Sequence, residues 1–125
     1  MKYLVDTHVI IWHFEGSPKI TPTVNKIIDS SKIFISSVSL WEIAIKLNLG
    51  KLSLNFTINE LFNDIKRRDL TILQIEDAYL IGLTKLPFIH NDPFDRLLIS
   101  TAIAENLTII TIDENIQKYN VSWVW

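Results

Sequence analysis

Hydrophobic positions along the chain follow two alternating patterns. Short apolar runs rich in β-branched residues occur at residues 3–5, 33–35, 70–75 and 107–112, and residues 121–125 have the composition of a short final strand. Runs of this length and composition are typical of strands buried in a parallel sheet. Between them, apolar residues recur every three to four positions, which indicates helices packed against that sheet.

Local signals place the helix starts. Pro22 suits the first turn of a helix that opens at Thr21, and Thr57-Ile58-Asn59-Glu60 matches a capping box. Helices are therefore expected from Thr21, from Ser37 or Ser39 to a residue before Gly50, from Thr57, over residues 77–86 and over residues 93–105.

Strands that alternate with helices over the whole length predict an α/β fold, a sandwich with a mostly parallel central sheet and right-handed crossovers. No linker, internal repeat or low-complexity tract interrupts the pattern. Since 125 residues are enough for one ordinary core and not for two, we expect a single domain over residues 1–125.

Composition narrows the function classes. The chain is 48% hydrophobic and 21% charged, so it should fold throughout, and its net charge of −2 argues against a broad basic surface for nucleic acid. It has no cysteine, so any metal must be held by oxygen or histidine ligands. Residues 1–6 lack the features of a secretory signal and no apolar run reaches the roughly 18 residues of a membrane span, which predicts a cytoplasmic protein without a membrane partner.

Four acidic residues stand where strands end or helices begin. Asp6 and Asp113 directly follow predicted strands, and Glu42 lies in the first turns of the helix after the second strand. Ligand sites of parallel sheets lie outside the carboxyl ends of the strands, so these three should meet at one edge. Asp95 lies in the first turn of a later helix, and we expect it at the same edge only if the preceding loop, residues 86–92, carries the chain back there.

Each acid taken alone has a structural explanation. Ser39 to Glu42 reads as a capping box, Asp92 as an N-cap before Asp95, and Asp6 or Asp113 as the start of a turn. Four converging carboxylates would nevertheless repel, because two charges about 4 Å apart cost on the order of 4 kcal/mol at an effective dielectric near 20. A hard cation such as Mg²⁺ or Mn²⁺ would offset this repulsion and would suit phosphodiester hydrolysis.

The motifs around these acids form a familiar series: Leu4-Val5-Asp6-Thr7-His8, residues 37–46 around Trp41-Glu42, residues 90–99 around Asp92-Pro93-Phe94-Asp95-Arg96, and Ile110-Thr111-Ile112-Asp113. In this order they resemble the PIN-domain ribonucleases, and in particular the VapC-type toxins of toxin–antitoxin pairs. The resemblance implies a PIN-like α/β/α sandwich and a Mg²⁺-dependent endoribonuclease in which Mn²⁺ can substitute. It also implies an RNA substrate, a cognate antitoxin and a homodimer.

The resemblance assigns Asp6, Glu42, Asp95 and Asp113 as the catalytic, metal-binding quartet, with Asp6 and Asp95 as the direct ligands. Glu42 and Asp113 would complete the site or orient water. Thr7 and Thr111 match positions where a hydroxyl can hydrogen-bond a ligand carboxylate, although both also suit turns. Asp92 resembles an additional acid of one subgroup, but we interpret it as an N-cap.

Several polar and aromatic residues fit either a functional or a structural role. Arg96 and Lys46 would contact RNA phosphates or pair with the acids, and His90 lies near the acidic loop, whereas His8 and His13 lack the spacing of a zinc site. The remaining candidates, for which we favour a structural role, are the cations Lys66, Arg67 and Arg68 and the aromatics Trp12, Trp41, Trp123 and Trp125.

Other functions fit the sequence less well. An aspartyl-phosphate phosphatase would need a second acid two residues after Asp6, where the chain has His8. Three glycines cannot supply the glycine-rich loop of a nucleotide-binding enzyme. A catalytically silent PIN-like module that binds RNA or protein remains the alternative.

Overall fold

A five-stranded sheet forms the centre of the computed structural model, which describes residues 1–125. The strands are β1 (Lys2–Val5), β2 (Lys32–Ser36), β3 (Thr71–Leu73), β4 (Thr108–Ile110) and β5 (Trp123–Val124), in the order β3-β2-β1-β4-β5. Every neighbouring pair is parallel. The predicted mostly parallel α/β sheet is thus confirmed, and all five expected strands are present.

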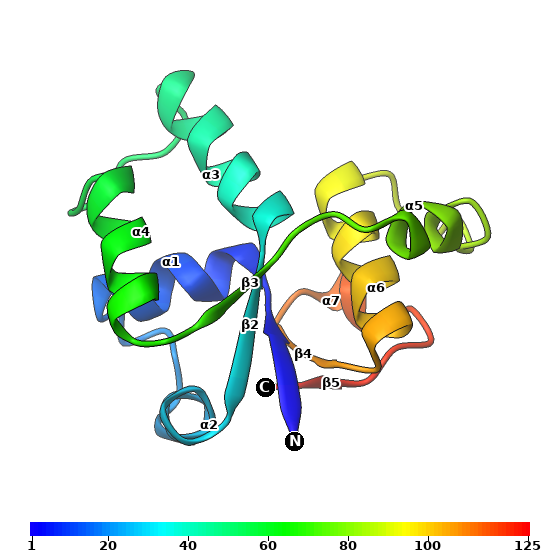
Figure 1. The fold of residues 1–125 in the computed structure, drawn as a ribbon, viewed down its shortest axis with the longest axis horizontal. Coiled ribbons are helices and arrows are strands. Elements are labelled where there is room, and N and C mark those ends of the chain that lie inside the picture. Colours follow the sequence, from blue (N-terminus) through cyan, green and yellow to red (C-terminus); the bar gives the residue numbers. More distant parts are fainter.

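Helices cover both faces of this sheet. They are α1 (Thr7–Glu15), α2 (Pro22–Ser30), α3 (Ser37–Asn48), α4 (Ile58–Arg67), α5 (Asp77–Leu83), α6 (Pro93–Glu105) and α7 (Glu114–Gln117). Figure 1 shows α1, α2 and α4 on one side of the strands and α5, α6 and α7 on the other. None of the helices is both long and apolar enough to cross a membrane.

The central strand shows why both faces must be covered. Successive side chains of a strand point to opposite faces. On β1, Tyr3 and Val5 pack into the larger core cluster with α1, α2 and α4, whereas Leu4 packs into the cluster formed with α6 and α7. Leu4 is fully buried, so β1 lies in the middle of the molecule.

Most helix starts follow the expected local chemistry. Thr57 and Glu60 form the predicted capping box of α4, and Thr21 accepts a hydrogen bond from the Val24 backbone at the start of α2. The cap of α3 is different from the expected one. Ser36 occupies the N-cap position and accepts from Val38 N at 3.1 Å, because the strand runs directly into the helix without a connecting loop.

Two helices, α1 and α7, lie outside the predicted ones. The β-branched residues Thr7, Val9, Ile10 and Ile11 of α1 have a low helix propensity and look like a continuation of β1. Burial of all four against the core overrides that preference, and Gly16 ends the helix in the left-handed conformation. Helix α7 is a single turn of four residues, too short to produce a periodic pattern.

The strand order contains one reversal, between β1 and β4. From β1 the chain proceeds outward to β2 and β3 on one side, and it later returns to add β4 and β5 on the other. The connections that leave β1 and β4 therefore diverge to opposite faces at the carboxyl edge of the sheet. Open parallel sheets bind their ligands at such switch points.

One half-buried histidine makes stability depend on pH. Burial and the nearby Arg68 lower the pKa of His13, and its Nε2 is buried without a hydrogen-bond partner. The unfolded chain therefore binds a proton more readily than the folded one, and the free energy of unfolding falls as the pH drops below about 6.5. In His13→Gln, the difference between the melting temperatures at pH 7.5 and pH 5.5 should lose this component.

Thermal melts of the wild type and His13→Gln at both pH values measure the effect, since subtraction of the two profiles cancels the contributions of all other groups. An identical pH profile for wild type and His13→Gln would contradict this prediction.

Candidate active site

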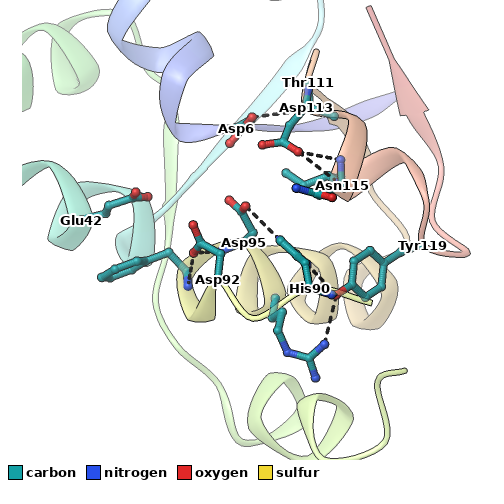
Figure 2. A network of polar contacts seen from close by, with 12 residues as sticks. Asp6, Glu42, His90, Asp92, Asp95, Thr111, Asp113, Asn115 and Tyr119 are labelled. Carbon is teal, nitrogen blue, oxygen red and sulfur yellow. Dashed lines mark hydrogen bonds and ion pairs between the residues drawn. The ribbon is translucent and has the colours of Figure 1, made fainter. Parts of the chain in front are cut away.

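The four acids predicted from the sequence gather at the carboxyl edge of the sheet. Asp6 directly follows β1, Glu42 lies in the second turn of α3, Asp95 in the first turn of α6, and Asp113 caps α7 after β4. In Figure 2 the carboxylates of Asp6, Asp95 and Asp113 face a common centre, which Glu42 approaches from α3. We call this group the acidic site. It coincides with the switch point between β1 and β4.

Asp6 is the most deeply buried member, with 2% of its surface exposed. Thr111 donates a hydrogen bond from Oγ1 to Asp6 Oδ2 at 2.8 Å, which bridges the ends of β1 and β4 and confirms the expected role of this hydroxyl. Burial raises the pKa of Asp6, although Thr111, His8 and the Thr7 backbone lower it and Asp113 raises it further. The hydrogen bonds to Asp6 therefore do not fully offset the cost of burying its charged carboxylate.

Asp95 reaches the acidic site by a simpler route than the expected one. Helix α6 packs on the sheet and leads directly into β4, so it runs against the strand direction and its first turn already lies at the carboxyl edge. The long preceding loop is not needed to bring it back, and the expectation that such a helix starts at the opposite edge was wrong. Any helix that returns the chain to the start of a parallel strand begins at the carboxyl edge.

The surroundings of Asp95 make it the most perturbed acid. Burial, opposed by a hydrogen bond from His90 and reinforced by Asp92, Asp6 and Asp113, raises the pKa of Asp95 to about 7. His90 Nε2 lies 3.1 Å from Asp95 Oδ2. Because Asp6 and Asp113 contribute to the raised pKa of Asp95, carboxylates from three different elements interact electrostatically.

Glu42 is a functional candidate rather than a cap. It is 5% exposed and lies in the interior of α3, three residues beyond the position that could reach back to the N-cap, so the capping-box interpretation is wrong. Its Oε2 accepts a hydrogen bond from Lys46 Nζ at 2.7 Å, while its Oε1 is buried without a partner. A buried carboxylate oxygen without a partner is costly unless something else binds it.

Asp92 and Asp113 both act as N-caps. Asp92 Oδ1 accepts from the backbones of Phe94 and Asp95, as we interpreted it, and Asp113 Oδ1 accepts from Asn115 and Ile116. In each case the hydrogen bonds go to a single oxygen. The other oxygen of Asp113 remains available in the acidic site, so its capping role and its predicted site role are compatible.

The structure shows the contacts of most residues that had two interpretations. Lys46 pairs with Glu42, whereas Arg96 is 8% exposed and donates to the backbone oxygens of Pro87 and Leu86, so it neither pairs with an acid nor faces solvent. Thr7 donates to Ser39 instead of to a carboxylate, so its expected role was wrong. Arg67 and Arg68 pair with Asp64 and Asp29, in agreement with the structural interpretation.

Comparison with known proteins decides the family. The family model described as the PIN domain matches residues 3–121, which includes all four acids. The chain belongs to the PIN domain family. PIN domains are generally nucleases that hydrolyse phosphodiester bonds. No curated protein matches the sequence.

Solved structures share this PIN fold. A chain of VapBC2 from Rickettsia felis, solved with a DNA fragment from the promoter, has a TM-score of 0.74 at 20% identity, with 99% of this chain and 98% of that chain covered. FitAcB from Neisseria gonorrhoeae gives 0.70 at 19% identity, covering 98% and 96%. A toxin–antitoxin complex from Klebsiella pneumoniae gives 0.66 at 15% identity, covering 98% and 96%.

The donor set of this PIN domain suits a hard cation. The side chains do not form a closed cage, since no three histidine, aspartate or glutamate residues lie close enough to share direct coordination. Mg²⁺ needs only one or two direct carboxylates and keeps several waters. The raised pKa values of Asp6 and Asp95 and the unpartnered Oε1 of Glu42 are what a cation at this edge would relieve.

One residue near the acids carried no signal in the sequence. Tyr119 is 4% exposed, and its hydroxyl contacts both His90 and Arg96. A single tyrosine six residues after Asp113, beyond a one-turn helix, fits no recognisable motif. Only the fold brings it to the residue that contacts Asp95.

Proposed function

We propose that this PIN domain is a metal-dependent endoribonuclease and the toxin component of a toxin–antitoxin pair of the VapC type. The observation that carries the proposal is the acidic site itself. Carboxylates from four separate elements meet at the switch point of the sheet, and burial together with mutual repulsion raises the pKa of Asp95 to about 7. Arrangements of this kind cost stability and are characteristic of functional sites.

In this proposal, Asp6 and Asp95 bind Mg²⁺ or Mn²⁺ directly. When bound, the ion supplies Lewis-acid stabilisation of a phosphoryl oxygen and lowers the pKa of an attacking water. Thr111 fixes the orientation of Asp6 through its 2.8 Å hydrogen bond, and the cap bonds hold Asp113 beside it. Glu42 has one oxygen held by Lys46 and one free to orient water or complete the metal site.

Lys46 is the cation placed to meet the substrate. Its pKa is raised by the hydrogen bond from its ammonium group to Glu42 and by the charges of Glu42, Asp92 and Asp95, although partial burial opposes them. The side chain is 39% exposed at the border of the acidic site. An ammonium group there favours the approach of an RNA phosphate to carboxylates that would otherwise repel it.

An antitoxin and a second copy of the chain are the proposed protein partners. The structural relatives include a complex named as toxin–antitoxin and others named VapBC2 and FitAcB, which supports an antitoxin. The antitoxin would cover the acidic site, as the family resemblance implies. The homodimer rests on the same resemblance.

Incubation with a mixed pool of structured RNA tests the proposal. The wild type should cleave RNA in Mg²⁺ or Mn²⁺ and not in EDTA, and Asp6→Asn should lose at least about 100-fold in rate, since metal stabilisation of the transition state is worth several kcal/mol. Both proteins should unfold cooperatively, which shows that the variant is folded. A folded wild type that neither cleaves RNA nor binds Mg²⁺ by calorimetry would contradict the proposal and favour the catalytically silent module.

A further inference from the structure

A chain of hydrogen bonds leads from the acidic site into the protein. Asp95 contacts His90, and His90 contacts the Tyr119 hydroxyl (Figure 2). The same hydroxyl contacts Arg96. Tyr119 and Arg96 are buried, and the side chains of His90 and Asp95 are 12% and 14% exposed. Because solvent has little access, each polar atom in this chain must find its partner within it.

The Tyr119 hydroxyl makes three hydrogen bonds, and the direction of two is fixed. The backbone N–H of His90 donates to the tyrosine oxygen at 3.2 Å, and Arg96 Nη1 donates to it at 3.0 Å. Neither group can accept a hydrogen bond. A hydroxyl oxygen has two lone pairs, so these two donors occupy its whole accepting capacity.

The third contact is therefore a donation by the Tyr119 O–H. It points to His90 Nδ1 at 2.7 Å, so Nδ1 must present its lone pair and cannot carry a proton. A neutral imidazole without a proton on Nδ1 carries it on Nε2. Nε2 is the atom that lies 3.1 Å from Asp95 Oδ2, so His90 donates to Asp95 as an uncharged group.

We infer that Tyr119 is a positioning residue of the acidic site: it holds His90 in the Nε2–H form, and His90 in turn fixes Asp95 Oδ2 so that Oδ1 faces the centre. Asp95 Oδ1 accepts no hydrogen bond within the protein. A neutral donor orients the carboxylate and leaves the negative charge of the site available to a cation, whereas an imidazolium would compete with that cation. The consequence for the metal rests on the proposed function; the hydrogen-bond directions do not.

Arg96 completes the support from the other side. It binds the backbone oxygens of Pro87 and Leu86 and stacks over Phe88 with 4.6 Å from its guanidinium carbon to the ring centroid. Its charge beside the tyrosine oxygen polarises the O–H and strengthens the bond to His90. The loop that carries His90 is thereby fastened to α6, the helix that carries Asp95.

Nitrogen NMR of metal-free protein with labelled histidine tests the inference without RNA or metal. In the wild type near pH 8, His90 should be a single Nε2–H tautomer with a ring proton protected from exchange with water. In Tyr119→Phe this proton signal should disappear, because the ring loses the bond that fixes it. Tyr79→Phe removes a hydroxyl that donates a hydrogen bond to Glu105, away from the acidic site, and should leave the signal unchanged.

Mn²⁺ binding by calorimetry then measures the effect on the site. Outer hydrogen-bond partners of metal ligands typically change metal affinity by about 10- to 100-fold, so Tyr119→Phe should weaken Mn²⁺ binding by about 10-fold or more. His90→Gln places an amide nitrogen near the position of Nε2 and should bind Mn²⁺ nearly as well as the wild type. His90→Asn places its amide near Nδ1 and should bind it about 10-fold more weakly.

The outcomes separate this inference from the proposed function. An Nδ1–H tautomer or an imidazolium in the wild type overturns it, as does a Tyr119→Phe variant with an unchanged ring proton. If Tyr119→Phe does not fold, the wild-type tautomer and the two His90 variants still decide the matter. The predicted tautomer in a chain that neither binds Mn²⁺ nor cleaves RNA would support the positioning network and refute the metal-dependent nuclease.

Discussion

Asp95→Asn should abolish RNA cleavage and at the same time stabilise the metal-free protein. The substitution removes a proposed direct metal ligand, so the cleavage rate should fall by at least about 100-fold. It also removes a carboxylate whose pKa is raised to about 7 by burial and by the charges of Asp92, Asp6 and Asp113. The amide oxygen of asparagine can still accept the hydrogen bond from His90.

The sign of the stability change follows from proton binding. Between about pH 4 and pH 7 the folded chain keeps a proton on Asp95 that the unfolded chain has released, so this group's contribution is full at low pH and is lost as the pH rises through 7. At pH 8 the asparagine variant avoids that loss. Solvent near the side chain reduces the effect, and we expect a gain of about 1–2 kcal/mol in the free energy of unfolding.

Asp77→Asn is the matched control, because Asp77 also lies in the first turn of a helix but is exposed. It should cleave normally and lose a few tenths of a kcal/mol, the opposite sign, since an acid favours a helix start. Urea unfolding in EDTA at pH 5 and pH 8 provides the measurement. An Asp95→Asn protein that is less stable than the wild type at pH 8 would contradict the electrostatic account, and one that cleaves at the normal rate would contradict the site.

Glu42→Gln should lose most of the cleavage activity while the fold persists. The side chain keeps its size and its amide oxygen can still accept from Lys46, but the charge next to the buried Oε1 position is gone. If Glu42 orients water or completes the metal site, the rate should fall by about 10- to 100-fold. The matched control is Glu60→Gln, because Glu60 belongs to the capping box of α4.

The two variants should therefore differ in their cleavage activity. Glu60→Gln should retain full activity, and Glu42→Gln should retain its stability to within about 1 kcal/mol, since no cap is lost. Initial cleavage rates together with thermal melts of both variants compare them. Normal activity of Glu42→Gln would assign the residue a purely structural role as the partner of Lys46.

The sheet and the convergence of Asp6, Glu42 and Asp113 could be predicted from the sequence, because they depend on short-range patterns and one topological rule. Buried parallel strands produce uninterrupted apolar runs, and acids that follow two such strands must meet at the carboxyl edge. Thr57 and Glu60 gave a correct helix start for a similar reason, since both hydrogen bonds of the capping box span only three residues.

Features that depend on tertiary contacts could not be predicted from the sequence. Helix α1 forms against the preference of its β-branched residues, because the core buries them. Arg96 turns inward to backbone oxygens that no pattern reveals, and Thr7 finds Ser39 across 32 positions. Tyr119 joins the site only through the packing of α7 and its following turn. In each case the partner is chosen by the fold and not by neighbours in the chain.

The pairing of β1 with β4 determines when the acidic site can first be complete during synthesis. Leu4 lies opposite Ile109 in this pairing, and Thr111 reaches Asp6 across 105 positions. A nascent chain that has not yet produced β4 has only one neighbour for its central strand and lacks Asp113, Thr111 and Tyr119. Contacts of such long sequence separation form late and together. A partly made chain therefore lacks a complete acidic site, and the site forms in one step when β4 joins the sheet.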